Sequence, residues 1–159
     1  MCDDCVTYLS SFSWHVGCRW NAYCRYVPIS VGWGWSRHEA WNETNAGANT
    51  ISSNRVHDYK QTLNDGGGIY MLGPQNGSQI HDNWVYNQHT ASSGALYPDE
   101  GSAYSTWTHN VVTDIGTSEW LHLWTGAHAN AREHSVLVLS SNCLTAHIVP
   151  AIEQDRFTT

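Results

Sequence analysis

The chain has 159 residues, a length that suits one domain. Its formal net charge is −7 and Lys60 is its only lysine, so it lacks the clustered basic side chains that bind nucleic acid or an anionic membrane surface. No apolar run is long enough to cross a bilayer, so neither nucleic acid nor a membrane is an expected partner.

The segment 1–27 does not fit the repeat that runs through the middle of the chain. It contains four of the five cysteines: Cys2, Cys5, Cys18 and Cys24. The spacing C-x2-C-x12-C-x5-C allows a zinc site or two disulfides, and we favour disulfides over zinc and unpaired cysteines over both. Asp3 and Asp4 stand where a signal peptide would have basic and then apolar residues, so no signal peptide is expected.

The segment 28–44 begins with a short apolar strand and continues into a loop rich in glycine and tryptophan. Packing of aromatic side chains under a loop is one interpretation of this composition. The other is a sugar-binding loop, because indole rings stack on the apolar faces of pyranose rings. Three tryptophans fall close together between positions 33 and 41, beside a polar histidine. We therefore slightly favour sugar binding by Trp33, Trp35 and His38.

A repeat runs through the middle of the chain. Three segments share it: NTISSNRVHD at 49–58, GSQIHDNWVYN at 77–87 and YSTWTHNVVTD at 104–114. Each has a large apolar residue, then an asparagine, then a valine: Ile51, Asn54 and Val56; Ile80, Asn83 and Val85; Trp107, Asn110 and Val112. The asparagine positions differ by 83 − 54 = 29 and by 110 − 83 = 27, a period typical of stacked repeats. Short strands between glycine and asparagine turns favour β-coils over helices.

The asparagines of the repeat have a structural interpretation. Asparagine tolerates a left-handed backbone at a tight bend, and side-chain amides in stacked coils can hydrogen bond to one another. We therefore favour a structural over a catalytic role for Asn54, Asn83 and Asn110. A second signal repeats as well, because the segment GIY at 68–70 matches GAL at 94–96, a step of 94 − 68 = 26.

Acidic residues stand beside the glycine turns of the repeat. Asp65 precedes three glycines, and the pair Asp99 and Glu100 precedes Gly101. We expect these acids at equivalent corners of neighbouring coils, one of Asp99 and Glu100 facing the same groove as Asp65. Asp-Gly and Glu-Gly are also ordinary turn formers, so either acid alone would indicate only a turn. Together they slightly favour a catalytic pair.

The segment SEWLHLWTG at 118–126 alternates polar or aromatic residues with leucine. A period of two places alternate residues on opposite faces of one strand. With Leu121 and Leu123 pointing inward, Trp120, His122 and Trp124 would point outward beside the acids. We therefore add His122 and Trp124 to the expected substrate-binding residues.

The repeat is confined to the middle of the chain. It begins near Pro28 and ends near Val136, after which there is neither a glycine turn nor a repeating asparagine. The predicted organisation is an aperiodic, cysteine-containing flank at 1–27, parallel coils at 28–136 and an aperiodic C-terminal flank at 137–159.

The segments NTISSNRVHD, TLNDGGGIYMLGPQNG, GALYPDEGSAY and HNVVTDIG resemble carbohydrate-active proteins of the right-handed parallel β-helix (pectate-lyase-like) superfamily. They are most similar to its glycoside hydrolase branches. The resemblance implies an all-β fold, a single-stranded solenoid of about three to four coils. Members of the family are several times longer, so this solenoid is expected to be incomplete and the chain a fragment. The family also implies an extracellular location and a carbohydrate partner.

Glycoside hydrolysis needs two carboxyl groups, one to protonate the leaving oxygen and one to act as base or nucleophile. Asp65 with Asp99 or Glu100 could supply them without a cofactor or metal. A polysaccharide lyase of the same fold is an alternative, but it needs cationic side chains against an acidic sugar. One lysine and six arginines fit that poorly and favour a neutral sugar. The other alternative is a non-catalytic sugar-binding or surface repeat protein, so whether this chain is an enzyme stays open.

Overall fold

The computed structural model describes the backbone of residues 7–9, 15–16, 21–22, 24–32, 47–117, 119–123, 136–140 and 143–148. Side chains are described for residues 24–32, 47–117 and 119–123. These parts of the chain form strands, turns and bends, which confirms the all-β prediction for them. None of these residues belongs to a helix that could cross a membrane.

The strands form three sheets. The first sheet has the order β1-β4-β7-β10, with β1 at Thr7–Leu9, β4 at Ile29–Gly32, β7 at Ile69–Leu72 and β10 at Leu96–Pro98. The second has the order β11-β8-β5-β2, with β2 at His15–Val16, β5 at Thr50–Ser52, β8 at Pro74–His81 and β11 at Ala103–Thr108. The third has the order β14-β13-β12-β9-β6-β3, with β3 at Asn21–Ala22, β6 at Arg55–Tyr59, β9 at Trp84–Gln88, β12 at Asn110–Thr113, β13 at Val136–Ser140 and β14 at Cys143–Ile148.

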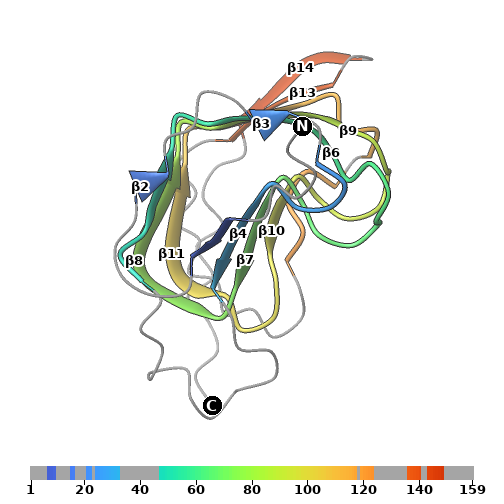
Figure 1. Cartoon of the computed structure of the whole chain (residues 1–159). Coiled ribbons are helices and arrows are strands. Elements are labelled where there is room, and N and C mark those ends of the chain that lie inside the picture. The colour runs from blue at the N-terminus through green and yellow to red at the C-terminus, as the bar shows by residue number, and fades with distance from the viewer. Residues whose placement is uncertain are drawn as a thin grey trace, which may run out of the picture.

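From β1 to β9, each strand pairs in parallel with the strand three places later in the chain. The chain therefore visits the first, second and third sheets in turn, and Figure 1 shows β4, β7 and β10 side by side, apart from β8 and β11. Strands β1, β2 and β3 precede residue 28, so backbone pairing begins earlier than the side-chain pattern indicates. In the third sheet, β13 continues in parallel with β12, and β14 pairs with β13 in the antiparallel sense.

The interior is filled by apolar side chains that stand directly above one another in successive strands. In-register stacks come from the first, second and third sheets respectively: Ile29, Ile69 and Leu96; Ile51, Ile80 and Trp107; Val56, Val85 and Val112. Each of these side chains is at most 1% exposed, and they form one cluster. Burying a side chain of this size contributes about 1.5–3 kcal/mol, so these stacks hold the three sheets together.

The asparagine ladder predicted from the sequence is confirmed. The Nδ2 of Asn54 donates to Oδ1 of Asn83 at 2.8 Å, and the Nδ2 of Asn83 donates to Oδ1 of Asn110 at 2.9 Å. The backbone N–H groups of Asn54 and Asn83 donate to the same two oxygens. One physical reason given for the ladder is wrong, because the left-handed backbone falls on the preceding residues, Ser53, Asp82 and His109. The asparagines are needed for their two-sided hydrogen bonding and not for a positive φ.

The step predicted for the first sheet, 94 − 68 = 26, is too short by one position. Leu96 lies opposite Ile69 and Tyr97 opposite Tyr70, so the observed step is 96 − 69 = 27. The run of three glycines hid the register, because Gly67 and not Gly68 packs against the backbone of Gly94. A slip by one position would move every side chain of a strand to its other face. Only the observed register places Tyr70 and Tyr97 on the same outer face.

The ladder yields a test of folding. Replacing Asn83 with alanine would remove the acceptor of the Asn54 amide and backbone N–H, and the donor to the carbonyl of Ile51 and to Oδ1 of Asn110. Unpaired buried polar groups are costly, so the free energy of unfolding should fall by about 3 kcal/mol. Urea denaturation measures this loss. The control is Gln79→Ala on the exposed side of β8, which should change stability by less than about 0.5 kcal/mol; equal effects of the two substitutions would contradict the ladder.

Candidate functional site

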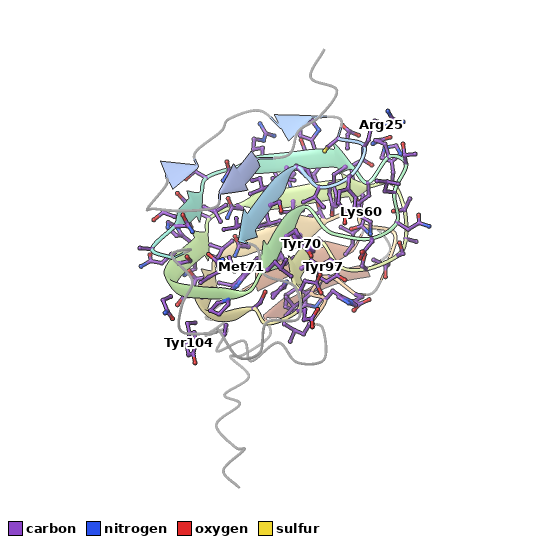
Figure 2. The ribbon with its side chains drawn as sticks, turned by 60° about the horizontal axis from the view of Figure 1, so that its bottom comes forward. Arg25, Lys60, Tyr70, Met71, Tyr97 and Tyr104 are labelled. Carbon is purple, nitrogen blue, oxygen red and sulfur yellow. The ribbon has the colours of Figure 1, made fainter. Side chains whose placement is uncertain are left out.

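Two tyrosines define the candidate site on the outer face of the first sheet. Tyr70 of β7 and Tyr97 of β10 are opposite one another, with ring centroids 5.3 Å apart in an edge-to-face arrangement. Figure 2 shows the two labelled rings next to one another on these strands. Both are buried and form a second apolar cluster with Val27 and Leu72, separate from the interior.

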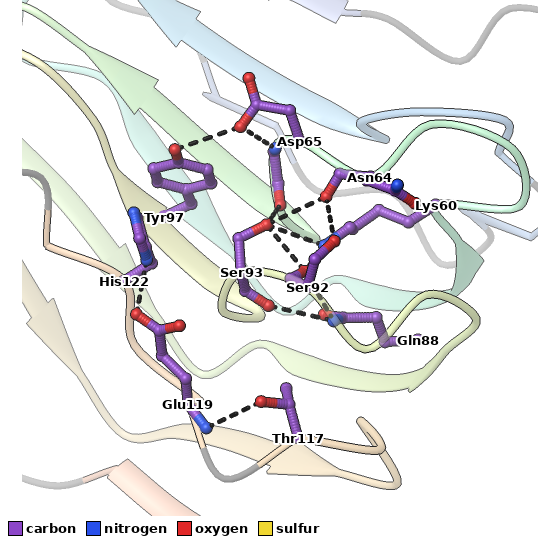
Figure 3. Close-up of polar contacts among 11 residues, drawn as sticks. Lys60, Asn64, Asp65, Gln88, Ser92, Ser93, Tyr97, Thr117, Glu119 and His122 are labelled. Atoms are coloured by element: carbon purple, nitrogen blue, oxygen red, sulfur yellow. Dashed lines mark hydrogen bonds and ion pairs between the residues drawn. The ribbon is translucent and has the colours of Figure 1, made fainter.

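Asp65 reaches this pair from the turn that precedes β7. Its Oδ1 accepts hydrogen bonds from the Tyr97 hydroxyl at 3.2 Å and from the Gly66 N–H at 2.9 Å (Figure 3). Gly66 has a φ of 90°, and a Cβ on it would lie 2.4 Å from a methyl group of Val27. A glycine is therefore required there, and the tight turn leaves the Asp65 side chain exposed.

Asp99 reaches the same pair from the turn that follows β10. The Tyr70 hydroxyl donates to its Oδ2, and its backbone N–H donates to the carbonyl of Met71 at 2.8 Å. Asp99 is only 5% exposed, whereas Glu100 beside it is half-buried. Between the two acids of this pair, Asp99 is therefore the one whose carboxylate faces the tyrosines.

The expectation that the acids occupy equivalent corners of successive coils is wrong. With a step of 27, the counterpart of Asp65 is Ser92 (65 + 27) and the counterpart of Asp99 is Leu72 (99 − 27). Asp65 therefore precedes the strand pair and Asp99 follows it. The long phenol side chains of Tyr70 and Tyr97 bridge this offset, so Asp99 contacts the first ring and Asp65 the second ring of one tyrosine pair.

The electrostatics of the site keep both hydroxyl groups protonated. Burial raises the pKa of Tyr70, and the hydrogen bond and negative charge of Asp99 raise it further. Burial also raises the pKa of Tyr97, and the negative charges of Asp99 and Asp65 raise it further. Both phenols therefore remain hydrogen-bond donors above the usual tyrosine pKa of 10.0. A donor and an acceptor are thus paired at each end of the site.

His122 completes the site on the side of Tyr97. The two rings are 4.4 Å apart, edge to face, and the His122 Nδ1 is hydrogen bonded to Oε1 of Glu119 (Figure 3). Backbone bonds between this segment and Leu96 place it beside β10. The predicted alternation of faces is wrong in part, because Trp120 packs against the core while Leu123 is 48% exposed.

The remaining predicted site residues are not tested by the structure. Trp33, Trp35, His38 and Trp124 lie outside the described residues, so their roles stay predictions. The sequence analysis missed Tyr70, Tyr97 and Glu119. The signal for the tyrosines was present, because their separation, 97 − 70 = 27, equals that of Asn83 and Asn110. In the described ranges, no group of three or more histidine, cysteine, aspartate or glutamate side chains is placed to hold a metal ion.

A second group of aromatic side chains lies on the outer face of the third sheet. Trp84 and Tyr86 have ring centroids 4.4 Å apart, His57 stacks on Tyr86 at 4.9 Å, and the guanidinium of Arg55 lies 4.8 Å from the Trp84 ring. These planar groups cover one another's faces, which leaves less ring surface for a ligand. The outer face of the first sheet, where Tyr70 and Tyr97 each bond to a carboxylate, is therefore the better candidate.

Comparison with known proteins bears on the fold. A solved structure named "Glycoside hydrolase" is similar to this chain, with a TM-score of 0.61 and 23% sequence identity. The match covers 76% of this chain and 22% of that one, so the chain spans about a fifth of the length of that protein. At this level of identity the likeness shows a shared fold. No protein-family model and no curated protein matches the chain.

The two tyrosine–carboxylate contacts predict unequal effects on stability. Tyr70→Phe would leave the buried Asp99 carboxylate without its phenol donor, so the free energy of unfolding should fall by about 1–3 kcal/mol. Tyr97→Phe should cost less than about 1 kcal/mol, since Asp65 is exposed and keeps the Gly66 N–H. Urea denaturation of this matched pair measures both, and a larger loss for Tyr97→Phe would contradict the burial of Asp99.

Lys60 was also overlooked, and it provides a pH test. Burial lowers its pKa from 10.5 to about 8, against the opposing charges of Asp65 and Glu119. Between pH 8 and pH 10 the unfolded chain therefore binds a proton that the folded chain does not. The free energy of unfolding should rise with pH across this interval, by up to about 1.4 kcal/mol per unit. The difference between wild type and Lys60→Met in the free energy of unfolding, measured against pH, isolates the contribution of Lys60. The same pH dependence in both proteins would contradict the lowered pKa.

Proposed function

We propose that the protein is a carbohydrate-active right-handed parallel β-helix and that it hydrolyses a glycosidic bond of a neutral sugar. Three sheets visited in turn by parallel strands support the β-helix, as does the similarity to a solved structure named "Glycoside hydrolase". The observation that carries the chemistry is the meeting of two carboxylates, those of Asp65 and Asp99, at one tyrosine pair. An extracellular location and coils spanning residues 28–136 belong to the same proposal.

The proposed roles follow from exposure and from hydrogen bonding. Asp65 is exposed and can therefore be reached by a leaving glycosidic oxygen, so we assign it the role of general acid. Asp99 is fixed by Tyr70 and by its own backbone, so it is the base or nucleophile. His122, beside Tyr97 and partly exposed, is proposed to bind the sugar near Asp65. Trp33, Trp35, His38 and Trp124 are proposed to bind further sugar units by stacking and hydrogen bonding.

The proposed substrate is neutral because the chain has one lysine and six arginines, and of these neither Lys60 nor Arg55 is placed to meet an acidic sugar. A polysaccharide lyase needs a lysine or arginine base and cations against the substrate carboxylate. Lys60, the only lysine, is fully buried and bonded to protein oxygen atoms, so it cannot meet a uronate. Arg55, on the outer face of the third sheet, lies against Trp84 and away from the two acids. A neutral sugar therefore remains favoured over an acidic one.

One observation favours a second candidate function, non-catalytic sugar binding. Asp99 is 5% exposed, and the Tyr70 hydroxyl occupies one of its oxygens. In that case Asp99 would orient Tyr70, while the exposed Asp65 and the partly exposed His122 would contact the sugar. The two functions differ in what the acids contribute, namely turnover in the first and tyrosine orientation in the second.

The experiment compares three aspartate substitutions in this chain. Asp65→Asn and Asp99→Asn should each lower hydrolysis of a neutral aryl glycoside or oligosaccharide by at least about a hundredfold, because a proton-transfer group is lost. Asp114→Asn is the matched control, since Asp114 is exposed with a φ of 52° that asparagine also tolerates, and it should keep wild-type turnover. Reducing-end release is measured for turnover, and calorimetry for binding.

Three outcomes are informative. Loss of turnover with sugar binding retained supports the hydrolase. Turnover that survives both substitutions in folded protein contradicts the assignment of the acids. Binding without hydrolysis of any substrate in a panel of neutral glycans, weakened by His122→Ala, would replace the hydrolase with the sugar-binding function.

A further inference from the structure

The ammonium group of Lys60 occupies a buried site made of oxygen atoms. Its Nζ donates to the carbonyl of Ser92 and to Oγ of Ser93, the latter at 2.8 Å (Figure 3). Lys60 has no solvent exposure, and no carboxylate of the described residues forms an ion pair with it. The ammonium group is therefore bonded to a carbonyl oxygen and a hydroxyl oxygen, which are the oxygen ligands expected of a site for a small cation.

The two serines beside Lys60 connect it to the turn that carries Asp65. Oγ of Ser93 lies 3.2 Å from the carbonyl of Asn64 and 2.9 Å from the carbonyl of Gly66. Oγ of Ser92 donates to the same Asn64 carbonyl at 2.6 Å. Asn64 and Gly66 are the residues on either side of Asp65. The 88–93 loop therefore contacts the turn on both sides of Asp65.

The loop itself is gathered around the same point. Nε2 of Gln88 lies 2.7 to 3.3 Å from three carbonyls of the loop: Thr90, Ser92 and Ser93. Together with the carbonyls of Asn64 and Gly66, this gives more acceptors than the glutamine and the serine hydroxyl groups can satisfy. An ammonium group supplies three donors, so it can bond to the acceptors that are left over, which a side chain without a donor could not.

We propose that Lys60 is a positioning residue for the candidate site, acting as a tethered cation that holds the 88–93 loop against the 64–66 turn and thereby fixes Asp65 beside Tyr97. The inference rests on the proposed function for its catalytic meaning. The role of Lys60 in holding the 64–66 turn does not rest on it, because the stability of this turn can be measured without substrate. Gly66 is the reporter, since its N–H donates to Asp65 and its carbonyl faces Ser93.

The experiment uses two variants of Lys60 that differ in the space they leave. Lys60→Ala removes the ammonium group and opens room for a small ion, whereas Lys60→Met fills the room without a donor. Hydrogen exchange of the Gly66 amide is followed by NMR relative to the amide of Val85 in the core. Each variant is measured in ethylammonium chloride and in sodium chloride at the same concentration.

Both variants should exchange the Gly66 amide about tenfold faster in sodium chloride, because a charge-assisted contact is lost. Ethylammonium should restore Lys60→Ala and not Lys60→Met. Unchanged Gly66 exchange in both variants, or no difference between the two salts for Lys60→Ala, overturns the proposal. Should Lys60→Ala fail to fold, Ser93→Ala decides, since it removes the hydroxyl between Lys60 and the carbonyls of Asn64 and Gly66 and must also accelerate Gly66 exchange.

Turnover separates this inference from the proposed function. If the chain hydrolyses glycosides, Lys60→Ala should lower kcat by about a hundredfold with little change in KM, because Asp65 is misplaced rather than removed. Ethylammonium should recover that loss. If Asp65→Asn leaves hydrolysis intact, the proposed function fails while the Gly66 exchange result still decides the role of Lys60.

Discussion

The hydrogen bonds among Asn54, Asn83 and Asn110 are the constraint on which the rest of the structure depends. Each ladder oxygen accepts both the amide and the backbone N–H of the asparagine in the preceding strand set. These groups are buried, so a sliding strand would leave several of them unpaired at a cost of about 1–3 kcal/mol each. The ladder thereby fixes the register between successive strand sets, and the apolar stacks of the interior follow from that register.

The candidate site is a consequence of the same register on the outer surface. Tyr70 and Tyr97 are neighbours because the step between their strands, 97 − 70 = 27, equals the step between Asn83 and Asn110. The Tyr70 hydroxyl then bonds to Asp99, which follows β10, and the Tyr97 hydroxyl bonds to Asp65, which lies in the turn before β7. Lys60 and Ser93 anchor that turn from within the molecule. Interior register, outer tyrosines and acid placement are thus three results of one pairing pattern.

The sequence was informative where a residue type repeats for one physical reason. Asparagine, isoleucine and valine recur in the ladder and core, so their spacing predicted parallel all-β pairing and the ladder itself. Where glycine alone marked the period, the register was wrong by one position, because three consecutive glycines offer three equivalent alignments. Asp65 and the pair Asp99 and Glu100 were found by their position before glycine turns, but the offset between the acids depends on that register. The sequence did not predict a role for Lys60 at the site, because main-chain oxygen atoms form much of its environment and sequence patterns do not show them.

The register of the first sheet is the claim that most directly supports this account. It is measured by NMR, from nuclear Overhauser effects between backbone protons of β7 and β10 in the isotope-labelled chain. The account predicts cross-strand contacts that pair residue 70 with residue 97 and residue 69 with residue 96. Contacts that pair residue 70 with residue 96 would turn Tyr97 to the opposite face from Tyr70. That result would separate the two carboxylates and contradict the candidate site.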